Sequence, residues 1–332
     1  VDCGNPGTVR NGRVKFSSTV FKSRSTYSCD EPYYRLNGNS TYECSTDAEW
    51  VDVTGGDPTV PKCKPVCGRS GLSSEHGRIF GGRRANPGYF PWQVRLHTAD
   101  GVRGAGALIS DGWVLTAAHL FDGSRQASMW AGAVSLADAA ADPPVQLEGA
   151  VLHPGYRKQR ADRREYNFDH DIALVRLRRK VRLGPLLSPV CLPGGRAPET
   201  GRLGFIAGWG KTETRQLAVH LQYARVPVAR MDKCEGLDYR GRVPTFTANM
   251  ICAGQIPASS SRNADSCQGD SGGAYVFTDA RDPARHVVRG IVSFGPPQCG
   301  SFGVYTNVGN YIDWIQKTVE EWEDSESGEV ED

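Results

Sequence analysis

Short apolar segments separated by glycine and proline dominate the hydrophobic pattern of the chain. Gln93-Val94-Arg95-Leu96 and Trp113-Val114-Leu115 are examples, and similar runs recur from Ile79 to about Asn307. Runs of this length bounded by turn residues are typical of strands in an antiparallel barrel, whereas helices need longer periodic stretches. We therefore predict an all-β fold for this region.

A single helix is predicted at the carboxyl end of the chain. Four apolar residues behind Asn310 recur at helical spacing: Ile312, Ile315, Val319 and Trp322. This pattern indicates an amphipathic helix that docks by its apolar stripe. We expect the sequence after it, residues 320–332, to form a frayed tail.

The charges of the chain are unevenly distributed. Residues 320–332 carry eight acidic side chains and no Lys or Arg, so the net charge of +2 conceals a body with 39 basic and 29 acidic side chains, a net charge of +10. Such an excess of basic side chains can attract acidic partners, although it more often reflects a solvated surface.

Ten cysteines in an even set predict a disulfide framework and a secreted, extracellular protein. They are Cys3, Cys29, Cys44, Cys63, Cys67, Cys191, Cys234, Cys252, Cys267 and Cys299. No pair has the C-x₂-C spacing of a structural zinc site, and we expect neither a metal nor another cofactor.

No apolar run approaches the roughly 20 residues that cross a bilayer, and no motif supports nucleic-acid binding. Without an initiator Met or signal peptide, the chain is expected to be a mature or truncated fragment.

The pentapeptide Gly269-Asp270-Ser271-Gly272-Gly273 carries the clearest chemical signal. Glycines on both sides let the backbone turn so that the Ser271 hydroxyl and neighbouring N–H groups face one point. Ser271 is therefore the candidate nucleophile, and a plain glycine-rich turn is the alternative.

His119 and Asp171 are the candidate partners of this serine. His119 ends the strand-like run Thr116-Ala117-Ala118, which suits a general base that projects from a rigid edge. Taken alone, such a histidine is more often structural. Asp171 begins the buried run Asp171-Ile172-Ala173-Leu174, where a carboxylate needs a partner. Asp169 is the competing carboxylate, but it lacks the adjoining strand.

With these motifs in the order His, Asp, Ser, residues 79–319 resemble the chymotrypsin-fold (trypsin-like) serine proteases. The resemblance implies two six-stranded antiparallel β-barrels with a C-terminal helix. It places His119, Asp171 and Ser271 as a catalytic triad between the barrels. It also assigns the oxyanion hole to the backbone N–H groups of Gly269 and Ser271.

The same resemblance implies a primary specificity pocket for Arg or Lys. Asp265, six residues before Ser271, matches the carboxylate at the base of the pocket in trypsin-like members, and Gly295 and Gly303 match the small residues that keep it open. A long cationic side chain could then enter and meet a charge. Phe294 departs from the family, since most relatives have Trp there.

Arg78-Ile79-Phe80-Gly81-Gly82 resembles the activation site of the family, within a polar linker over residues 64–78. Cleavage after Arg78 would release an α-ammonium on Ile79, which in this family pairs with Asp270. The resemblance further implies the disulfides Cys67–Cys191, Cys234–Cys252 and Cys267–Cys299. The usual bridge beside the catalytic histidine is missing, because Gly104 and Leu120 occupy its two positions.

Residues 1–63 resemble a complement control protein (sushi) module. The resemblance rests on Cys3-Gly4, Asn11-Gly12, Tyr27-Ser28-Cys29, Tyr33, Cys44, Trp50 and Pro61-Lys62-Cys63. It implies the pairs Cys3–Cys44 and Cys29–Cys63, which would staple a segment too short to bury a sufficient core alone. Asn39-Ser40-Thr41 is a candidate glycosylation site.

The module, the missing bridge and the segments Phe168-Asp169-His170-Asp171 and Gly295-Pro296-Pro297-Gln298 together resemble the complement initiating proteases. This implies a protease that cleaves complement components 4 and 2 in the classical pathway, is inhibited by a serpin, and assembles with other initiation subunits through a missing N-terminal region. The alternatives are a lectin-pathway mannan-binding-lectin-associated protease, an r-subcomponent-like protease, or, from another class, a catalytically inactive adhesion or carrier protein.

Overall fold

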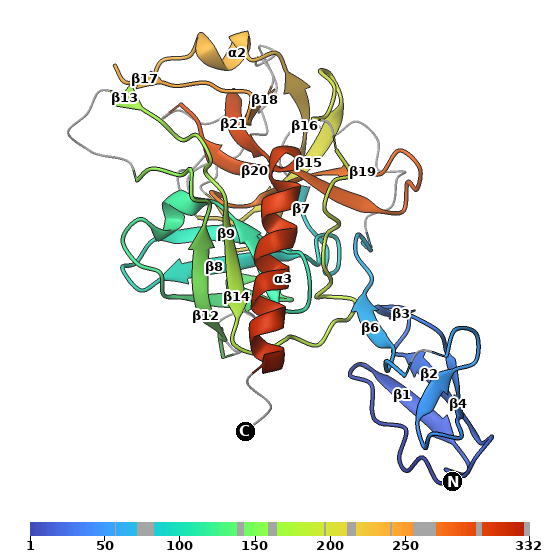
Figure 1. Cartoon of the computed structure of the whole chain (residues 1–332). Coiled ribbons are helices and arrows are strands. Elements are labelled where there is room, and N and C mark those ends of the chain that lie inside the picture. Colours follow the sequence, from blue (N-terminus) through green and yellow to red (C-terminus); the bar gives the residue numbers. More distant parts are fainter. Residues whose placement is uncertain are drawn as a thin grey trace. The chain divides into compact units, whose positions relative to one another are not determined.

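A computed structural model of the chain describes residues 1–56, 58–71, 83–137, 143–158, 165–195, 197–210, 217–239, 241–254, 270–296 and 301–328. The chain divides into two compact units (Figure 1). The small unit is Val1–Val66 and the large unit is Cys67–Asp332.

The small unit is built from short antiparallel strands around a few aromatic rings. One sheet has the order β1 (Gly12–Phe16), β2 (Arg24–Cys29), β4 (Thr41–Cys44) and β5 (Trp50–Asp52), and a second pairs β3 (Tyr34–Asn37) with β6 (Lys62–Pro65). Tyr27, Tyr42 and Trp50 form its core together with Cys44. Tyr27 and Tyr42 meet edge to face, with ring centroids 5.3 Å apart.

Two disulfides hold this small core, Cys3–Cys44 and Cys29–Cys63, as the resemblance implied. The unit extends beyond Cys63, where we expected it to end and the linker to begin. β6 continues to Pro65 opposite Tyr34, and the Val66 N–H donates to the Tyr33 carbonyl at 2.8 Å. The first residues of the predicted linker are therefore strand, because β3 offers them backbone partners.

The first half of the large unit is a closed six-stranded antiparallel barrel, in the order β10-β14-β12-β11-β8-β9. Its strands are β8 (Gln93–Thr98), β9 (Arg103–Leu108), β10 (Trp113–Thr116), β11 (Ala127–Ala131), β12 (Val145–Leu152) and β14 (Ala173–Leu177). All residues of β10 and β14 are buried. The short helix η1 (Ala118–Phe121) follows β10 directly.

The second half is a second six-stranded barrel, which the pairing of β15 with β16 closes. Its strands are β15 (Leu203–Gly208), β16 (Gln222–Ala229), β18 (Met250–Gly254), β19 (Ala274–Thr278), β20 (His286–Phe294) and β21 (Phe302–Asn307). Short β7 (Arg83–Arg84) adds to β16, and β13 (Glu165–Tyr166) pairs with β17 (Val243–Pro244). α2 (Asp232–Glu235) and η2 (Val308–Tyr311) are single turns. The all-β prediction with two barrels is confirmed.

The terminal helix α3 spans Ile312–Gly328 and is the long helix of Figure 1. Ile315 is 1% exposed, and the Trp322 ring meets Trp113 of β10 edge-on at 6.0 Å. The expectation of a frayed tail from residue 320 is wrong as far as Gly328, because the apolar stripe continues to Trp322. Residues 329–332 lie outside the described residues.

Two more disulfides brace the large unit, Cys67–Cys191 and Cys234–Cys252, and both match the pairings implied by resemblance. Cys267 and Cys299 lie outside the described residues, so the fifth pairing stays a prediction. Across the described helices, no segment is long and apolar enough to cross a membrane.

We expect Trp322→Ala to lower the melting temperature of the large unit, because it removes an aromatic contact worth about 0.5–1.5 kcal/mol beyond the area it buries. Glu321→Ala is the matched control, since it removes only the exposed pair with Lys317, worth about 0.2–0.5 kcal/mol. Scanning calorimetry would measure both variants. Equal shifts would contradict the docking of the end of α3.

Candidate active site

His119 and Asp171 lie close together because His119 follows β10, Asp171 precedes β14, and these two strands are paired. β10 runs antiparallel to β14 with Thr116 opposite Ala173, so η1 leaves β10 close to the residues that enter β14. Asp171 Oδ2 lies 2.8 Å from His119 Nδ1, and the His119 backbone N–H donates to Asp171 Oδ1 at 2.9 Å. The carboxylate therefore fixes both the backbone and the ring of the histidine.

The second barrel completes the surroundings of Asp171, whose side chain is fully buried. Ser293 Oγ of β20 donates to Asp171 Oδ2 at 2.5 Å, and Thr306 Oγ1 of β21 donates to the Asp171 carbonyl at 2.7 Å. Neither residue was predicted from the sequence. Their only signal is a hydroxyl within an apolar strand, which carries no motif.

The competing carboxylate, Asp169, faces other partners. It accepts hydrogen bonds from Thr247 Oγ1 at 2.8 Å and from Asn249 Nδ2 at 2.9 Å. Burial opposes its ionisation, but these hydrogen bonds and the nearby His170 lower the pKa of Asp169 below its ordinary value. The structure thus gives Asp169 a bracing role and leaves Asp171 as the partner of the histidine.

The charge of Asp171 changes the basicity of His119. Burial disfavours the protonated ring, but the negative charge and hydrogen bond of Asp171, with a smaller contribution from Asp122, outweigh it and raise the pKa of His119 above 6.5. Because Asp171 holds Nδ1, Nε2 is the nitrogen that can accept a proton. The ring is 18% exposed, so it borders solvent.

Ser271 lies in a turn that is tied to both barrels. Its carbonyl accepts a hydrogen bond from the Ala105 N–H of β9 at 2.8 Å, while the Gly272 N–H donates to the Val292 carbonyl of β20 at 2.8 Å. Gly272 has φ of +82°, and a Cβ there would overlap Thr116 Oγ1 at the end of β10. Only glycine fits, and the turn consequently brings Ser271 beside the residues that lead to His119.

The carboxylate of Asp270 fits against a surface made of two glycines. The Gly210 N–H donates to Asp270 Oδ1 at 2.8 Å, and a Cβ at Gly208 or Gly210 would overlap the carboxylate. Neither glycine was assigned a function from the sequence. Their only local signal is the Gly208-Trp209-Gly210 tripeptide.

Leu120 occupies the space of the missing disulfide. A Cβ at Gly104 would lie 2.5 Å from Leu120 Cδ1 and 3.0 Å from the Ser271 carbonyl oxygen. Leu120 is 2% exposed, so its side chain is packed rather than adaptable. Apolar packing therefore joins η1, the turn that carries His119, to β9 at the place where related enzymes have a disulfide.

An aromatic cluster borders the histidine on one side. Phe168 stacks on Phe294, with ring centroids 5.1 Å apart, and its edge meets His119 at 5.5 Å. Tyr166 and Tyr239 also contact Phe294, and burial raises the pKa of Tyr239 to about 12. Phe294 thus fills a packed wall in which a phenyl ring replaces the indole usual in relatives.

Only part of the predicted pocket lies in the described structure. A Cβ at Gly295 would lie 3.8 Å from the Cα of Gly303, so the two glycines face each other. Six predicted residues lie outside the described residues: Arg78, Ile79, Asp265, Cys267, Gly269 and Cys299. Their roles stay predictions.

Asn39 of the small unit is exposed, but its amide nitrogen is engaged. Nδ2 donates to Asp52 Oδ1 at 3.0 Å and to Thr54 Oγ1 at 2.6 Å. A glycan on this nitrogen would disturb both hydrogen bonds. Glycosylation of Asn39 stays a prediction.

Among the described residues, no group of three or more His, Cys, Asp or Glu side chains could hold a metal ion. The expectation that the chain needs no cofactor remains untested.

We expect Gly104→Ala to destabilise the large unit by about 1–3 kcal/mol, because the new methyl group overpacks Leu120 and the Ser271 backbone. Leu120→Ala alone should also destabilise, through the cavity it leaves. The double variant should lose less free energy of unfolding than the sum of the two single losses, and chemical denaturation measures this difference. Strict additivity would contradict the contact.

Comparison with known proteins agrees with this architecture. The Trypsin family model matches residues 79–315, and the Sushi repeat (SCR repeat) model matches residues 3–63. The solved structure of neuropsin, a serine protease expressed in the limbic system of mouse brain, matches with a TM-score of 0.58 at 33% identity, over 73% of this chain and 100% of that one.

Curated relatives extend the match across both units. Complement C1s subcomponent of Sus scrofa is 42% identical over 97% of this chain and 47% of its own length, and that of Bos taurus is 42% identical over 97% and 48%. Calcium-dependent serine proteinase of Mesocricetus auratus is 41% identical over 97% and 47%. The chain spans about half the length of these relatives. It belongs to the trypsin family of serine endopeptidases and carries a sushi repeat ahead of its protease unit.

Proposed function

We propose that this chain cleaves protein substrates after Arg or Lys in the initiation of complement, with complement components 4 and 2 as its substrates in the classical pathway. The observation that carries the chemistry is the buried Asp171 carboxylate, held by Ser293 and oriented on His119 beside the Ser271 turn. The complement assignment is supported by relatives named Complement C1s subcomponent.

In the proposed mechanism, Ser271 Oγ attacks the carbonyl carbon of the scissile peptide bond, and its proton passes to His119 Nε2. The negative charge that forms on the carbonyl oxygen is stabilised by the backbone N–H groups of Gly269 and Ser271. His119 then donates the proton to the departing amine. Water hydrolyses the acyl-enzyme by the same steps in reverse. Asp171 remains ionised and stabilises the imidazolium.

The Arg or Lys preference is proposed from three positions. Gly295 and Gly303 lie against each other, and neither carries a side chain that could obstruct a pocket beside them. Asp265 would supply the countercharge at the base of the pocket. A guanidinium or ammonium group buried in the pocket without an anionic partner would be strongly unfavourable. A carboxylate at position 265 therefore suits a cationic side chain better than a neutral residue would.

Activation is proposed to follow cleavage of the bond between Arg78 and Ile79. The new ammonium of Ile79 would pair with Asp270, whose carboxylate already accepts the Gly210 N–H in the glycine-lined recess. Cys67–Cys191 would keep the N-terminal part attached after this cleavage. N-terminal sequencing that finds a second start at Ile-Phe-Gly-Gly would test this proposal.

The remaining assignments rest on the resemblance to the complement initiating proteases rather than on the geometry. We propose that the protein is secreted, that a serpin-type inhibitor traps it, and that other initiation subunits bind through a region outside this chain. A lectin-pathway mannan-binding-lectin-associated protease or an r-subcomponent-like protease is the second candidate. The paired His119 and Asp171 disfavour an inactive adhesion or carrier protein.

We expect kcat/KM for a small Arg ester to fall on the acid side with a midpoint above pH 6.5, because only neutral His119 accepts the proton and its pKa is raised. Asp171→Asn removes the charge that raises this pKa, so the acid limb should move to lower pH. It should also reduce kcat by about 10⁴-fold, the loss known for this substitution in a serine protease. An acid limb that stays in place would contradict the coupling.

We expect the activated chain to cleave complement components 4 and 2 after a single Arg or Lys, and mass spectrometry of the fragments would locate the bonds. Ser271→Ala should abolish this cleavage while leaving the melting temperature unchanged, since it removes the nucleophile and little packing. Asp265→Ser should remove the preference for Arg esters over apolar esters. Hydrolysis of Arg esters without cleavage of either component would reject the proposed substrates but keep the endopeptidase.

A further inference from the structure

Three neighbouring strands of the first barrel carry cationic and aromatic side chains on their outer face. Along β8, Arg95 and His97 are partly exposed and alternate with buried residues. The strand register places Trp130 of β11 opposite Arg95, and Arg103 of β9 opposite His97. Residues that lie opposite each other in a sheet share a face. These four side chains, here called the outer cluster, therefore lie together on the outside of the barrel.

The indole of Trp130 supports the guanidinium of Arg95. Arg95 Cζ lies over the indole, 5.4 Å from the ring centroid, and the His97 ring lies 6.5 Å from the same indole. A guanidinium that covers an aromatic face keeps the N–H groups in its own plane, where they can bind a carboxylate. The packing thus positions Arg95 without using its hydrogen-bond donors.

The two arginines of the outer cluster repel each other. Burial, together with the positive charge of Arg103, lowers the pKa of Arg95 below 12.5, so the two guanidiniums lie close enough to interact. Arg103 is exposed. Among the described residues, neither guanidinium has a hydrogen bond or an ion pair. An anion placed between them would relieve the repulsion.

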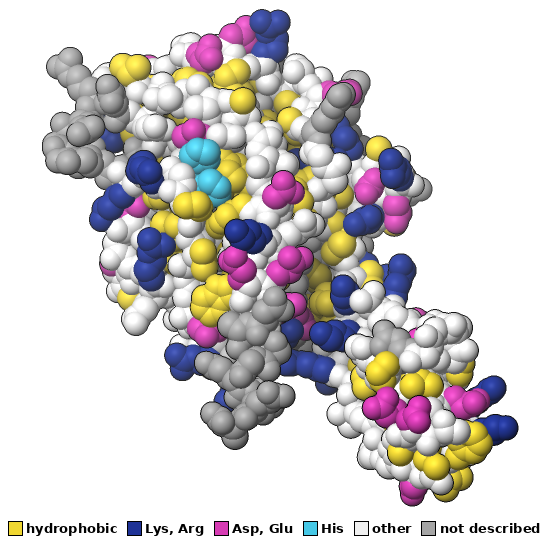
Figure 2. Space-filling model, in the orientation of Figure 1, with side chains coloured by type: hydrophobic (Ala, Val, Ile, Leu, Met, Phe, Trp, Pro, Cys, Tyr) yellow, Lys and Arg dark blue, Asp and Glu magenta, His cyan; other side chains and the backbone are white. Residues whose placement is uncertain are grey.

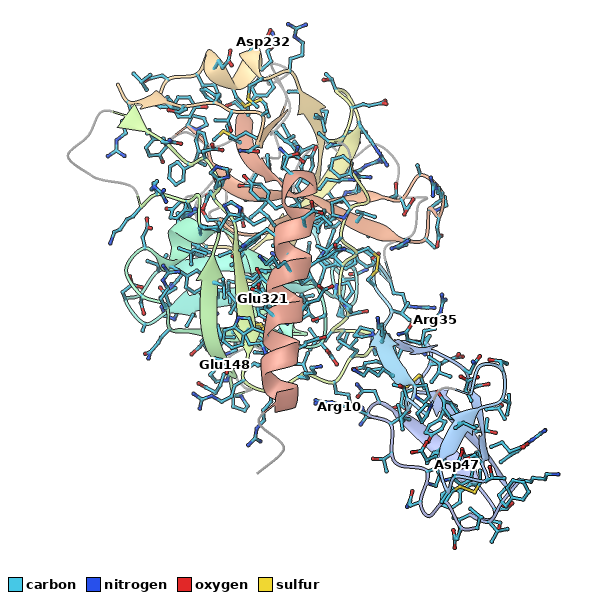
Figure 3. The ribbon with its side chains drawn as sticks, viewed as in Figure 1. Arg10, Arg35, Asp47, Glu148, Asp232 and Glu321 are labelled. Atoms are coloured by element: carbon cyan, nitrogen blue, oxygen red, sulfur yellow. A yellow bond between two sulfur atoms is a disulfide. The ribbon has the colours of Figure 1, made fainter. Side chains whose placement is uncertain are left out.

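Acidic side chains on the adjoining segments have other partners. Thr98 Oγ1 donates to Asp100 Oδ1 at 2.5 Å, where β8 turns toward β9. Glu148 of β12, labelled in Figure 3, lies 3.7 Å from Arg176 Nε. Figure 2 shows Lys and Arg side chains interspersed with acidic ones over the visible face of the large unit, so a single cationic side chain marks no site there. The outer cluster differs because two neighbouring guanidiniums have no described carboxylate bound to them.

The outer cluster begins where the second barrel stops covering the first. Gln93, two residues before Arg95 and on the same face of β8, is buried, and its Nε2 donates to a carbonyl of β15 at 2.9 Å. Ala105, two residues after Arg103, donates its N–H to the Ser271 carbonyl at 2.8 Å. Two residues of a strand span about 7 Å. A polypeptide held at Ser271 can therefore reach the cluster within a few residues.

We propose that the outer cluster binds an acidic segment of the protein substrate, close in sequence to the bond that is cleaved. This inference rests on the proposed cleavage of protein substrates and adds a determinant outside the Arg or Lys pocket. An extended chain advances about 3.3–3.6 Å per residue, so acidic residues within about six positions of the cleaved bond reach the cluster. A sulfated polysaccharide has a suitable charge as well, but the Ser271 turn beside the cluster is where a polypeptide is held.

Matched peptides test this preference with the activated full chain. Each quenched fluorescent peptide has one Arg at the cleaved bond and carries three Glu or three Gln residues, either before or after that bond. At low salt we expect kcat/KM to be about threefold to tenfold higher for the Glu peptide in one of the two placements, mainly through KM. The ratio should approach 1 in 0.5 M NaCl, where charges are screened beyond about 4 Å.

Variants of the cluster show whether these residues produce the ratio. Arg95→Gln and Arg103→Gln should each lower the Glu-to-Gln ratio, and the double variant should bring it close to 1. Trp130→Leu should lower it without a change of charge, because Arg95 loses its support. Arg179→Gln is the matched control, since it removes an exposed charge elsewhere on the first barrel. An equal fall in this control, or a ratio near 1 in the unsubstituted chain, would overturn the proposal.

Equilibrium binding separates failure of this site from failure of the proposed function. A Glu-rich peptide without Arg or Lys binds without turnover, so calorimetry of the full chain with Ser271→Ala measures its affinity directly. We expect Arg95→Gln with Arg103→Gln to abolish this binding and Arg179→Gln to preserve it. Binding without cleavage of any Arg peptide would support the surface and reject the proposed function. Cleavage of Arg peptides with neither binding nor a Glu preference would overturn the surface alone. A heparin fragment that binds the cluster when the Glu-rich peptide does not would assign the surface to polysaccharides and also overturn the proposal.

Discussion

The active site of this chain depends on one buried carboxylate. Asp171 is fully removed from solvent, and an ion in that position is tolerated only if its oxygens are hydrogen-bonded. Two of its donors come from His119 and one from Ser293, so the first barrel supplies the charge and the base while the second supplies the extra donor. The full set of donors around the buried carboxylate therefore exists only when the two barrels are closed on each other. Correct packing and an oriented base are consequently one event.

Close backbone approach is the second constraint, and glycine meets it at several points. Gly272 lets the Ser271 turn lie against β9 and the end of β10, and Gly208 and Gly210 admit the Asp270 carboxylate. Gly104 admits the Leu120 side chain. In that position, dispersion contacts take the place of a covalent bridge and act together with the hydrogen bonds from Asp171 to hold the turn that carries His119.

Sequence reasoning predicted the elements that depend on local pattern or on a motif. The strands alternate with turn residues, and the Gly-Asp-Ser-Gly-Gly motif and the order of His119, Asp171 and Ser271 identify the chemistry. Ser293 and Thr306 were not predicted, because a hydroxyl in an apolar strand carries no motif and the acceptors here, the carboxylate and the backbone carbonyl of Asp171, come from the other barrel. The end of α3 was misplaced for a related reason. Acidic composition suggested a tail from residue 320, although Trp322 already belonged to the predicted apolar stripe; in the structure its ring packs on Trp113, a residue distant in sequence, and the helix continues to Gly328.

Phe168 links the candidate base to the wall of the proposed specificity pocket. Its edge meets His119, its face stacks on Phe294, and Phe294 leads directly into Gly295. Tyr166 and Tyr239 already contact the Phe294 ring, so the ring is enclosed on these sides. A bulkier ring at position 294 would therefore have to displace Phe168. Movement of Phe168 would in turn reach the imidazole. The phenyl ring at 294 therefore packs both toward the candidate base and toward the proposed specificity pocket, so a change of its size would disturb both.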